Sequence, residues 1–206
     1  MHISDGILDP KICIGGYVIA ACLAGAALKK VKQEDITKIS VVGAAFFVSS
    51  LIHFKVGFSS VHLTLIGLVG IVLGIHSSLA IITGLFFQAV MFNHGGLSTL
   101  GVNSVTFSVP ALIVYGIFDM VYKRVRSLTI LGVFAGICAG AAIVLALLCV
   151  IVLLYFSGEE LLGFAYFFSL SNGVLALVEG VVTALAIIQI GKVKPQMLRS
   201  CRRYGA

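Results

Sequence analysis

The first two residues, Met1 and His2, could form most of a metal site by themselves. The free α-amine, the backbone nitrogen of residue 2 and an imidazole at residue 2 can chelate one divalent ion through a five-membered ring fused to a six-membered ring. A fourth in-plane position stays open for one further ligand. Coordination by nitrogen alone in a square plane favours Ni²⁺ or Cu²⁺ over Mg²⁺, Ca²⁺ or tetrahedral Zn²⁺. A histidine at a chain end is also common as a simple frayed terminus, so the rest of the chain must decide between the two interpretations.

The composition identifies an integral membrane protein. Of the 206 residues, 60% are hydrophobic and 11% are charged, and the mean hydropathy is +1.15, whereas soluble domains carry roughly 25% charged residues. The apolar runs are continuous and do not alternate in polarity as the strands of a membrane barrel do. We therefore expect an all-α membrane protein with a single integral membrane domain over residues 1–206. The net charge of +6 is explained by basic cytoplasmic loops without any nucleic-acid partner.

Seven apolar runs predict about seven transmembrane helices. They lie at about residues 11–29, 38–53, 61–75, 77–93, 105–122, 127–157 and 170–191. The third and fourth runs are short for a full crossing of the bilayer, which needs about 20 residues. We therefore expect these two helices to end at a polar cavity.

The distribution of charge predicts the orientation. Three basic clusters follow the first, fifth and seventh runs, and with seven spans all three fall on the cytoplasmic side. They comprise Lys29, Lys30, Lys32 and Lys38; Lys123, Arg124 and Arg126; and Lys192, Lys194, Arg199, Arg202 and Arg203. The N-terminus is then outside, and residues 192–206 form a basic cytoplasmic tail. Acidic residues precede the first run, which argues against a cleavable signal peptide, so we expect the mature chain to begin at Met1 and residues 1–10 to bind metal.

Two polar loops on the outer side carry the other candidate ligands. Ser59 or Ser60 is a natural N-cap for the third helix, which would place His62 in its first turn, where the helix dipole keeps an imidazole neutral. His62 then serves either as a metal ligand or as a partner of a loop carbonyl. In the second loop, Asn93, His94 and Asn103 could supply a ligand or orient one, beside a glycine pair that lets the loop pack closely.

Of four further features, three are open to two interpretations each. His53 is either part of the polar cluster or a helix-end residue, and His76 is expected in a turn. Glu179 lies inside the seventh helix, where an intramembrane carboxylate suggests function, although helix packing is an equal explanation. Small residues on the first helix form a smooth face that packs either internally or against another subunit. This face includes Ala20, Ala24 and Ala27.

Three motifs in this order resemble the CbiM/NikM family, the substrate-binding S components of energy-coupling factor (ECF) transporters for cobalt and nickel. They are Met1-His2-Ile3-Ser4-Asp5-Gly6-Ile7-Leu8, Ser59-Ser60-Val61-His62-Leu63, and Phe92-Asn93-His94-Gly95-Gly96-Leu97-Ser98-Thr99-Leu100-Gly101-Val102-Asn103. A fourth stretch, Glu179-Gly180-Val181-Val182-Thr183, resembles the family more weakly. The resemblance runs from residue 1 to about residue 190.

The resemblance implies an S-component fold with an extra N-terminal helix in the plasma membrane of a prokaryote. It implies that the amine of Met1, the amide and imidazole nitrogens of His2 and the imidazole of His62 bind Ni²⁺ or Co²⁺ as transported substrate, with no prosthetic group. It also implies a transmembrane coupling protein and paired ABC-type ATPases as partners, with Ala20, Ala24 and Ala27 facing the coupling protein. Any small auxiliary membrane subunit is expected to be a separate chain.

Two other functions make different predictions for these residues. An S component for an organic vitamin predicts an aromatic-lined pocket and gives Met1 and His2 no role. An intramembrane serine hydrolase would use Ser59 or Ser60 as nucleophile and His94 as base, but the sequence contains no Gly-x-Ser-x-Gly elbow. The sequence also lacks a Gly-x-x-x-x-Gly-Lys-[Ser/Thr] loop. We therefore expect a transporter subunit that is not itself an enzyme and that depends on other chains for ATP.

Overall fold

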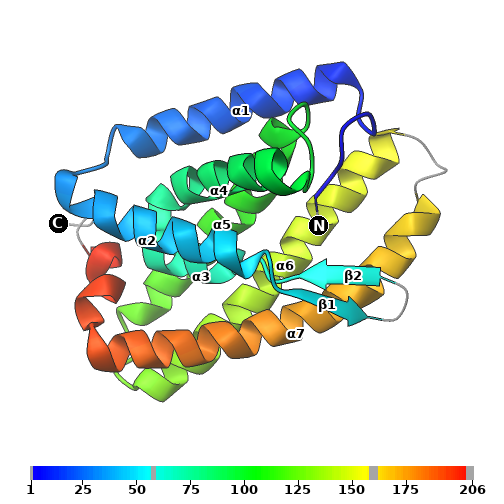
Figure 1. Ribbon diagram of the computed structural model, residues 1–206. Coiled ribbons are helices and arrows are strands. Elements are labelled where there is room, and N and C mark those ends of the chain that lie inside the picture. Colours follow the sequence, from blue (N-terminus) through cyan, green and yellow to red (C-terminus); the bar gives the residue numbers. More distant parts are fainter. Residues whose placement is uncertain (1, 57–58, 158–161, 203–206) are drawn as a thin grey trace.

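A computed structural model describes residues 2–56, 59–157 and 162–202, as a bundle of helices with one small hairpin (Figure 1). The helices are α1 (Pro10–Leu28), α2 (Gln33–Ser49), α3 (Ile66–Leu73), η1 (Gly74–His76), α4 (Ser77–Phe92), α5 (Leu100–Tyr122), α6 (Leu128–Ser157), α7 (Leu162–Val193) and η3 (Pro195–Arg202). The strands are β1 (His53–Val56) and β2 (Ser59–His62). The start of α1, the end of α4, the start of α5 and the hairpin gather at one end of the bundle (Figure 1).

The short helix α3 is the buried centre of the bundle. Seven of its eight residues are buried, and it packs against α2, α4, α5, α6 and α7. A Cβ placed on Gly70 would lie 2.3 Å from the carbonyl oxygen of Ala111 in α5, so only glycine lets these two backbones approach so closely. Because α3 follows β2 within a few residues, its tight packing also limits the movement of the end of the hairpin.

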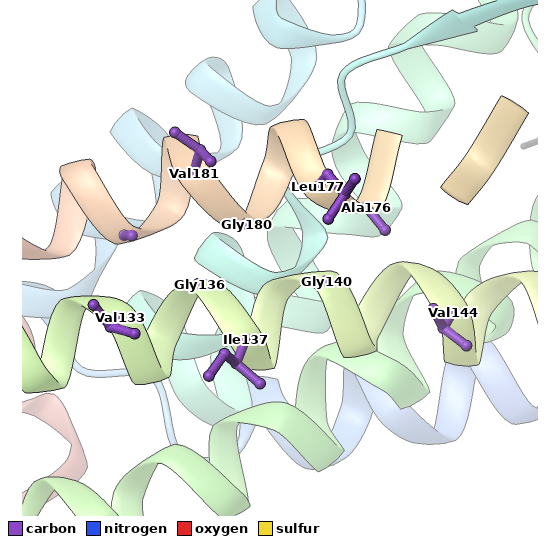
Figure 2. Close-up of a pocket in the computed structure, with 10 residues that line it drawn as sticks. Val133, Gly136, Ile137, Gly140, Val144, Ala176, Leu177, Gly180 and Val181 are labelled. Atoms are coloured by element: carbon purple, nitrogen blue, oxygen red, sulfur yellow. The ribbon is translucent and has the colours of Figure 1, made fainter. Parts of the chain in front are cut away.

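Helices α6 and α7 form the most extensive helix pair and meet along small residues. A Cβ on Gly136 would lie 2.5 Å from the carbonyl oxygen of Gly180. Beside this contact, exposed aliphatic side chains line a shallow groove on the surface of the bundle (Figure 2). They include Val133, Ile137, Val144, Leu177 and Val181. Such a surface is stable against lipid chains and not against water.

By length and composition, five segments of the described residues could cross a membrane. They are Pro10–Leu28, Ile66–Phe92, Leu100–Tyr122, Leu128–Ser157 and Ser171–Val193. The prediction of about seven spans is not confirmed, because α3, η1 and α4 form one continuous apolar stretch and α2 has only 17 residues. The multi-pass membrane character is supported, while the orientation of the termini stays a prediction.

The loop between α2 and α3 differs from the sequence prediction. Residues 53–56 and 59–62 pair as antiparallel strands, with His53 directly opposite His62, so the fold is not purely α-helical. Ser59 and Ser60 therefore do not cap α3, and His62 is not in a helical turn, because α3 begins only at Ile66. The dipole argument for a neutral His62 was wrong, and its neutrality needs another cause.

Two contacts at the far end of the bundle agree with the expected clustering of charge. The Nζ atom of Lys38 in α2 donates to the carbonyl of Met197 in η3 at 2.7 Å, so the first basic cluster and the start of the basic tail lie together. Near the end of α5, Asp119 forms an i,i+4 ion pair with Lys123 at 2.6 Å. His76 lies in η1 between α3 and α4, which confirms its prediction as a turn residue.

Candidate metal centre

The N-terminal segment is fastened to the bundle immediately after His2. The Asn103 side chain accepts from the N–H of Ile3 and donates to its carbonyl, each at 2.9 Å, and the Thr99 hydroxyl donates to the same carbonyl at 2.7 Å. Ile3 and Leu8 are buried with Cys13 and Val102. Both polar groups of Ile3 are thus satisfied by α5 or the loop before it, and this places the His2 side chain inside the fold. Figure 1 shows this segment running back from α1 into the bundle.

The loop before α5 packs directly on this segment. The Asp5 carboxylate accepts from the N–H of Ser98 at 2.9 Å and from its hydroxyl, and these bonds lower the pKa of Asp5. Gly95 has a φ of +78°, and a Cβ there would lie 3.3 Å from the Cβ of His2 and 3.0 Å from the Nδ2 of Asn103. The left-handed backbone and the lack of space both favour glycine. The glycine pair thus serves the close packing expected from the sequence.

Four imidazoles gather beneath these contacts. The rings of His2 and His62 are stacked, with centroids 4.8 Å apart and planes within 8°. His94 lies 5.8 Å from His62 and 6.4 Å from His2, while His53 lies 5.8 Å from His62 and 5.2 Å from His94. The structure therefore brings His2, His62 and His94 together as the sequence predicted, and it adds His53.

The ring nitrogens of His2 and His62 are buried and make no hydrogen bond of ordinary geometry with any described residue. Burial lowers the pKa of His62 to about 3, although the Leu63 backbone acts in the opposite direction. Burial, followed by the charges of neighbouring groups, holds the pKa of His2 well below its usual value. Because imidazolium is disfavoured in this site, both rings keep lone pairs free for a metal ion.

Glu179 of α7 fixes the backbone that follows His62. One carboxylate oxygen accepts from the N–H and hydroxyl of Thr64, the latter at 2.6 Å, and from the N–H of Leu65 at 3.0 Å. Leu65 has a φ of +53°, so that two successive N–H groups turn toward one anion. The carboxylate also lies at the N-terminus of α3, where the helix dipole favours negative charge.

No described set of three or more His, Cys, Asp or Glu side chains is arranged to hold a metal ion. Met1 lies outside the described residues, as do the side chains of Ser59 and Ser60, which leaves their predicted roles untested. Asn93 is exposed at the end of α4 with a φ of +56°, whereas Asn103 binds Ile3.

The small-residue face of α1 packs within the chain. Ala20 and Ala27 are buried and Ala24 is half-buried, and α1 contacts α5 and α4. These contacts use the face that the resemblance assigned to a coupling protein. Contact of Ala20, Ala24 and Ala27 with a partner stays a prediction.

Residues 2–197 match the family CbiM, described as the cobalt uptake substrate-specific transmembrane region. The chain belongs to the CbiM family. A CbiM relative, the cobalt transport protein CbiM of Lachnoclostridium phytofermentans, is 31% identical over 91% of this chain and 81% of its own length. A putative metal transport protein of Haemophilus influenzae is 29% identical over 99% of this chain and all of its own length. These relatives are named as transport proteins and not as enzymes.

Solved structures share the fold of this chain. A crystal structure of a transition metal transporter superimposes with a TM-score of 0.76 over the whole of both chains at 22% identity. A truncated transition metal transporter gives a TM-score of 0.73 over 95% of this chain and 99% of its own, at 20% identity. The family model over residues 2–197 confirms the family membership that the motifs predicted, and the solved structures agree with it in fold.

Proposed function

We propose that this chain is the substrate-capturing membrane subunit of a transporter that imports Ni²⁺ or Co²⁺. The ion is held in a square plane by the amine of Met1, the backbone and ring nitrogens of His2 and the ring of His62. The pairing of His2 with His62, with buried and unbonded ring nitrogens, is the observation that carries this proposal. Family membership supports the class of substrate, since relatives include a cobalt transport protein and a putative fused nickel transport protein of Archaeoglobus fulgidus.

The ligand set favours Ni²⁺ over Co²⁺, because four nitrogens in a plane suit a square-planar ion. The backbone nitrogen of His2 must lose its proton to bind the ion. The Asn103 side chain bonds the N–H and carbonyl of Ile3 and not the N–H of His2, so Asn103 does not hold that proton in place. Buried neutral imidazoles add no charge of their own, so the ionised amide offsets part of the charge of the ion. No described acidic side chain enters this set.

Import against a gradient requires ATP, and the sequence has no nucleotide-binding loop. The proposal therefore includes a transmembrane coupling protein and ABC-type ATPases as partners, as in ECF transporters. A small auxiliary membrane subunit belongs to the same proposal. An organic vitamin is a weaker candidate, because the groups that converge beside the N-terminal segment are imidazoles. A serine hydrolase has no support in the contacts described.

Isothermal calorimetry with NiCl₂ and CoCl₂ on the purified full chain tests the proposal. We expect His2→Ala and His62→Ala to reduce affinity at least about 100-fold, since each removes a ligand. His76→Ala serves as the matched control, because His76 is a buried histidine at the opposite end of α3. Wild-type affinity in both site variants would contradict the proposal, as would an equal loss in all three.

A further inference from the structure

Two of the four clustered histidines, His53 and His94, are outside the proposed four-nitrogen set. Their ring centroids are 5.2 Å apart and edge-on, and each ring lies 5.8 Å from His62. His53 is the direct cross-strand partner of His62, and residues opposite each other in a hairpin project from the same face. The hairpin and the loop after α4 thus bring a second pair of imidazoles to the edge of the first.

Exposure to solvent decreases from the outer pair to the inner pair. His53 is exposed, His94 is partly buried and His62 is only 8% exposed, while both ring nitrogens of His2 are buried. An ion from solution therefore meets His53 and His94 before it reaches His62. The outer pair would therefore bind the ion first, and His62 and His2 would bind it afterwards.

The outer histidines are prepared to bind a metal ion. The Nδ1 atom of His53 lies 2.9 Å from the carbonyl oxygen of Leu51. A carbonyl only accepts, so Nδ1 carries the proton and Nε2 carries the lone pair. A backbone carbonyl on the far ring nitrogen is the usual support of a metal-binding histidine. The Nδ1 atom of His94 is buried and makes no hydrogen bond with a described residue.

Two imidazoles are too few to hold an ion tightly, and no third metal-binding side chain joins them within the described residues. Weak binding suits an ion that keeps most of its water and soon moves on. From His94 the next rings are close, with His62 stacked at 5.8 Å and His2 at 6.4 Å. The ion therefore moves only about the distance between two neighbouring imidazole rings in each transfer.

We propose that His53 and His94 form an outer capture pair, which binds a hydrated divalent transition-metal ion at the mouth of the site and passes it to His62 and the N-terminal segment. This inference rests on the proposed function, because it requires an inner site to receive the ion. It assigns the outer pair to the rate of loading and the inner nitrogens to the strength of binding.

Stopped-flow binding of Ni²⁺ to the full chain in lipid nanodiscs tests the assignment. We expect His53→Ala/His94→Ala to slow association and dissociation alike, each about tenfold, so that the affinity changes less than about twofold, because a pair that only relays the ion speeds its passage in both directions. Ile52→Ala is the matched control, since it removes an exposed apolar side chain beside His53 and no nitrogen. Unchanged association, or an affinity lost through faster dissociation, would show that the two rings only support the loops.

A second arm separates this inference from the proposed function. In a chain extended by a few residues before Met1, the inner site is blocked, and weak Ni²⁺ binding should remain. That residual binding should fall at least about fivefold in the extended double variant. Equal residual binding with and without the two histidines would overturn the capture pair alone. Wild-type affinity in the extended chain would instead overturn the inner ligand set.

Discussion

The side chain of Asn103 in α5 makes two hydrogen bonds of 2.9 Å with the backbone of Ile3, and together they place His2 beside His62. Both partners are buried, so neither bond exchanges readily with water. The position of His2, a proposed ligand, therefore depends in part on the Asn103 amide, which lies outside the proposed ligand set.

We expect Asn103→Leu to weaken Ni²⁺ binding about 10- to 100-fold. The substitution leaves the N–H of Ile3 without its only described partner, and each unpaired buried group costs about 1–3 kcal/mol. Calorimetry with NiCl₂ measures the effect. Thr106→Val is the control, because the Thr106 hydroxyl bonds only within α5, to Val102. Full affinity in Asn103→Leu would mean that the N-terminal segment does not need this clamp.

A comparison of Gly95→Ala with Gly6→Ala distinguishes the effect of backbone strain from the effect of crowding against His2. Gly95→Ala and Gly6→Ala both place a Cβ on a residue with positive φ, at a cost of about 1–2 kcal/mol. The Cβ at residue 6 meets nothing within 4 Å, whereas the Cβ at residue 95 meets His2 and Asn103. We expect similar losses of thermal stability but a clear loss of Ni²⁺ affinity only in Gly95→Ala. Equal affinities in the two variants would show that the loop does not press on His2.

Glu179 links the metal centre to α7 through Thr64 and Leu65. We expect Glu179→Leu to lose at least about 100-fold in Ni²⁺ affinity, together with thermal stability, since three buried donors lose their acceptor. Glu179→Gln keeps a carbonyl oxygen and should bind within about tenfold of the parent chain.

Thr183→Val is the matched control for Glu179, because it lies one turn further along α7, is fully buried and has no described hydrogen bond. It should bind Ni²⁺ as the parent chain does. The role given to Glu179 would be wrong if Glu179→Leu folded and bound Ni²⁺ normally.

The number of protons released when Ni²⁺ binds reports whether the His2 and His62 rings are protonated beforehand. With the pKa of His62 at about 3 and that of His2 well lowered, both rings are neutral at pH 6. Binding should then release about two protons, one from the amine of Met1 and one from the amide of His2. Rings of ordinary pKa would add about 1.5 more. Calorimetry at pH 6 in buffers of different ionisation enthalpy counts the protons, and a value near 3.5 would contradict neutral rings.

The apolar runs indicated where the helices lie, because such runs leave few other structures in a membrane, but the predicted number of about seven spans is not confirmed. The sequence did not predict the hairpin, because four-residue strands beside polar turns are too short to show alternation. The sequence therefore left His53 open between the polar cluster and a helix end, and the structure places it opposite His62.

The contacts of Glu179 and Asn103 were harder to foresee than the clustering of the histidines. His2 and His62 stand in motifs that mark them, whereas Glu179 and Asn103 bind backbone groups of Thr64, Leu65 and Ile3. Every residue has such groups, so no residue type in the sequence identifies the partner. Only the folded chain shows which N–H groups a buried side chain meets.

The proposed site requires the terminal amine of Met1 to lie beside His2 as a ligand, and a change in the length of the N-terminus tests this requirement directly. Ni²⁺ affinity is compared by calorimetry between the chain that begins at Met1 and the same chain with two residues added before it. We predict a loss of at least about 1,000-fold in the extended chain, because one chelate ring can no longer close. An extended chain that binds Ni²⁺ as tightly as the original would contradict the account.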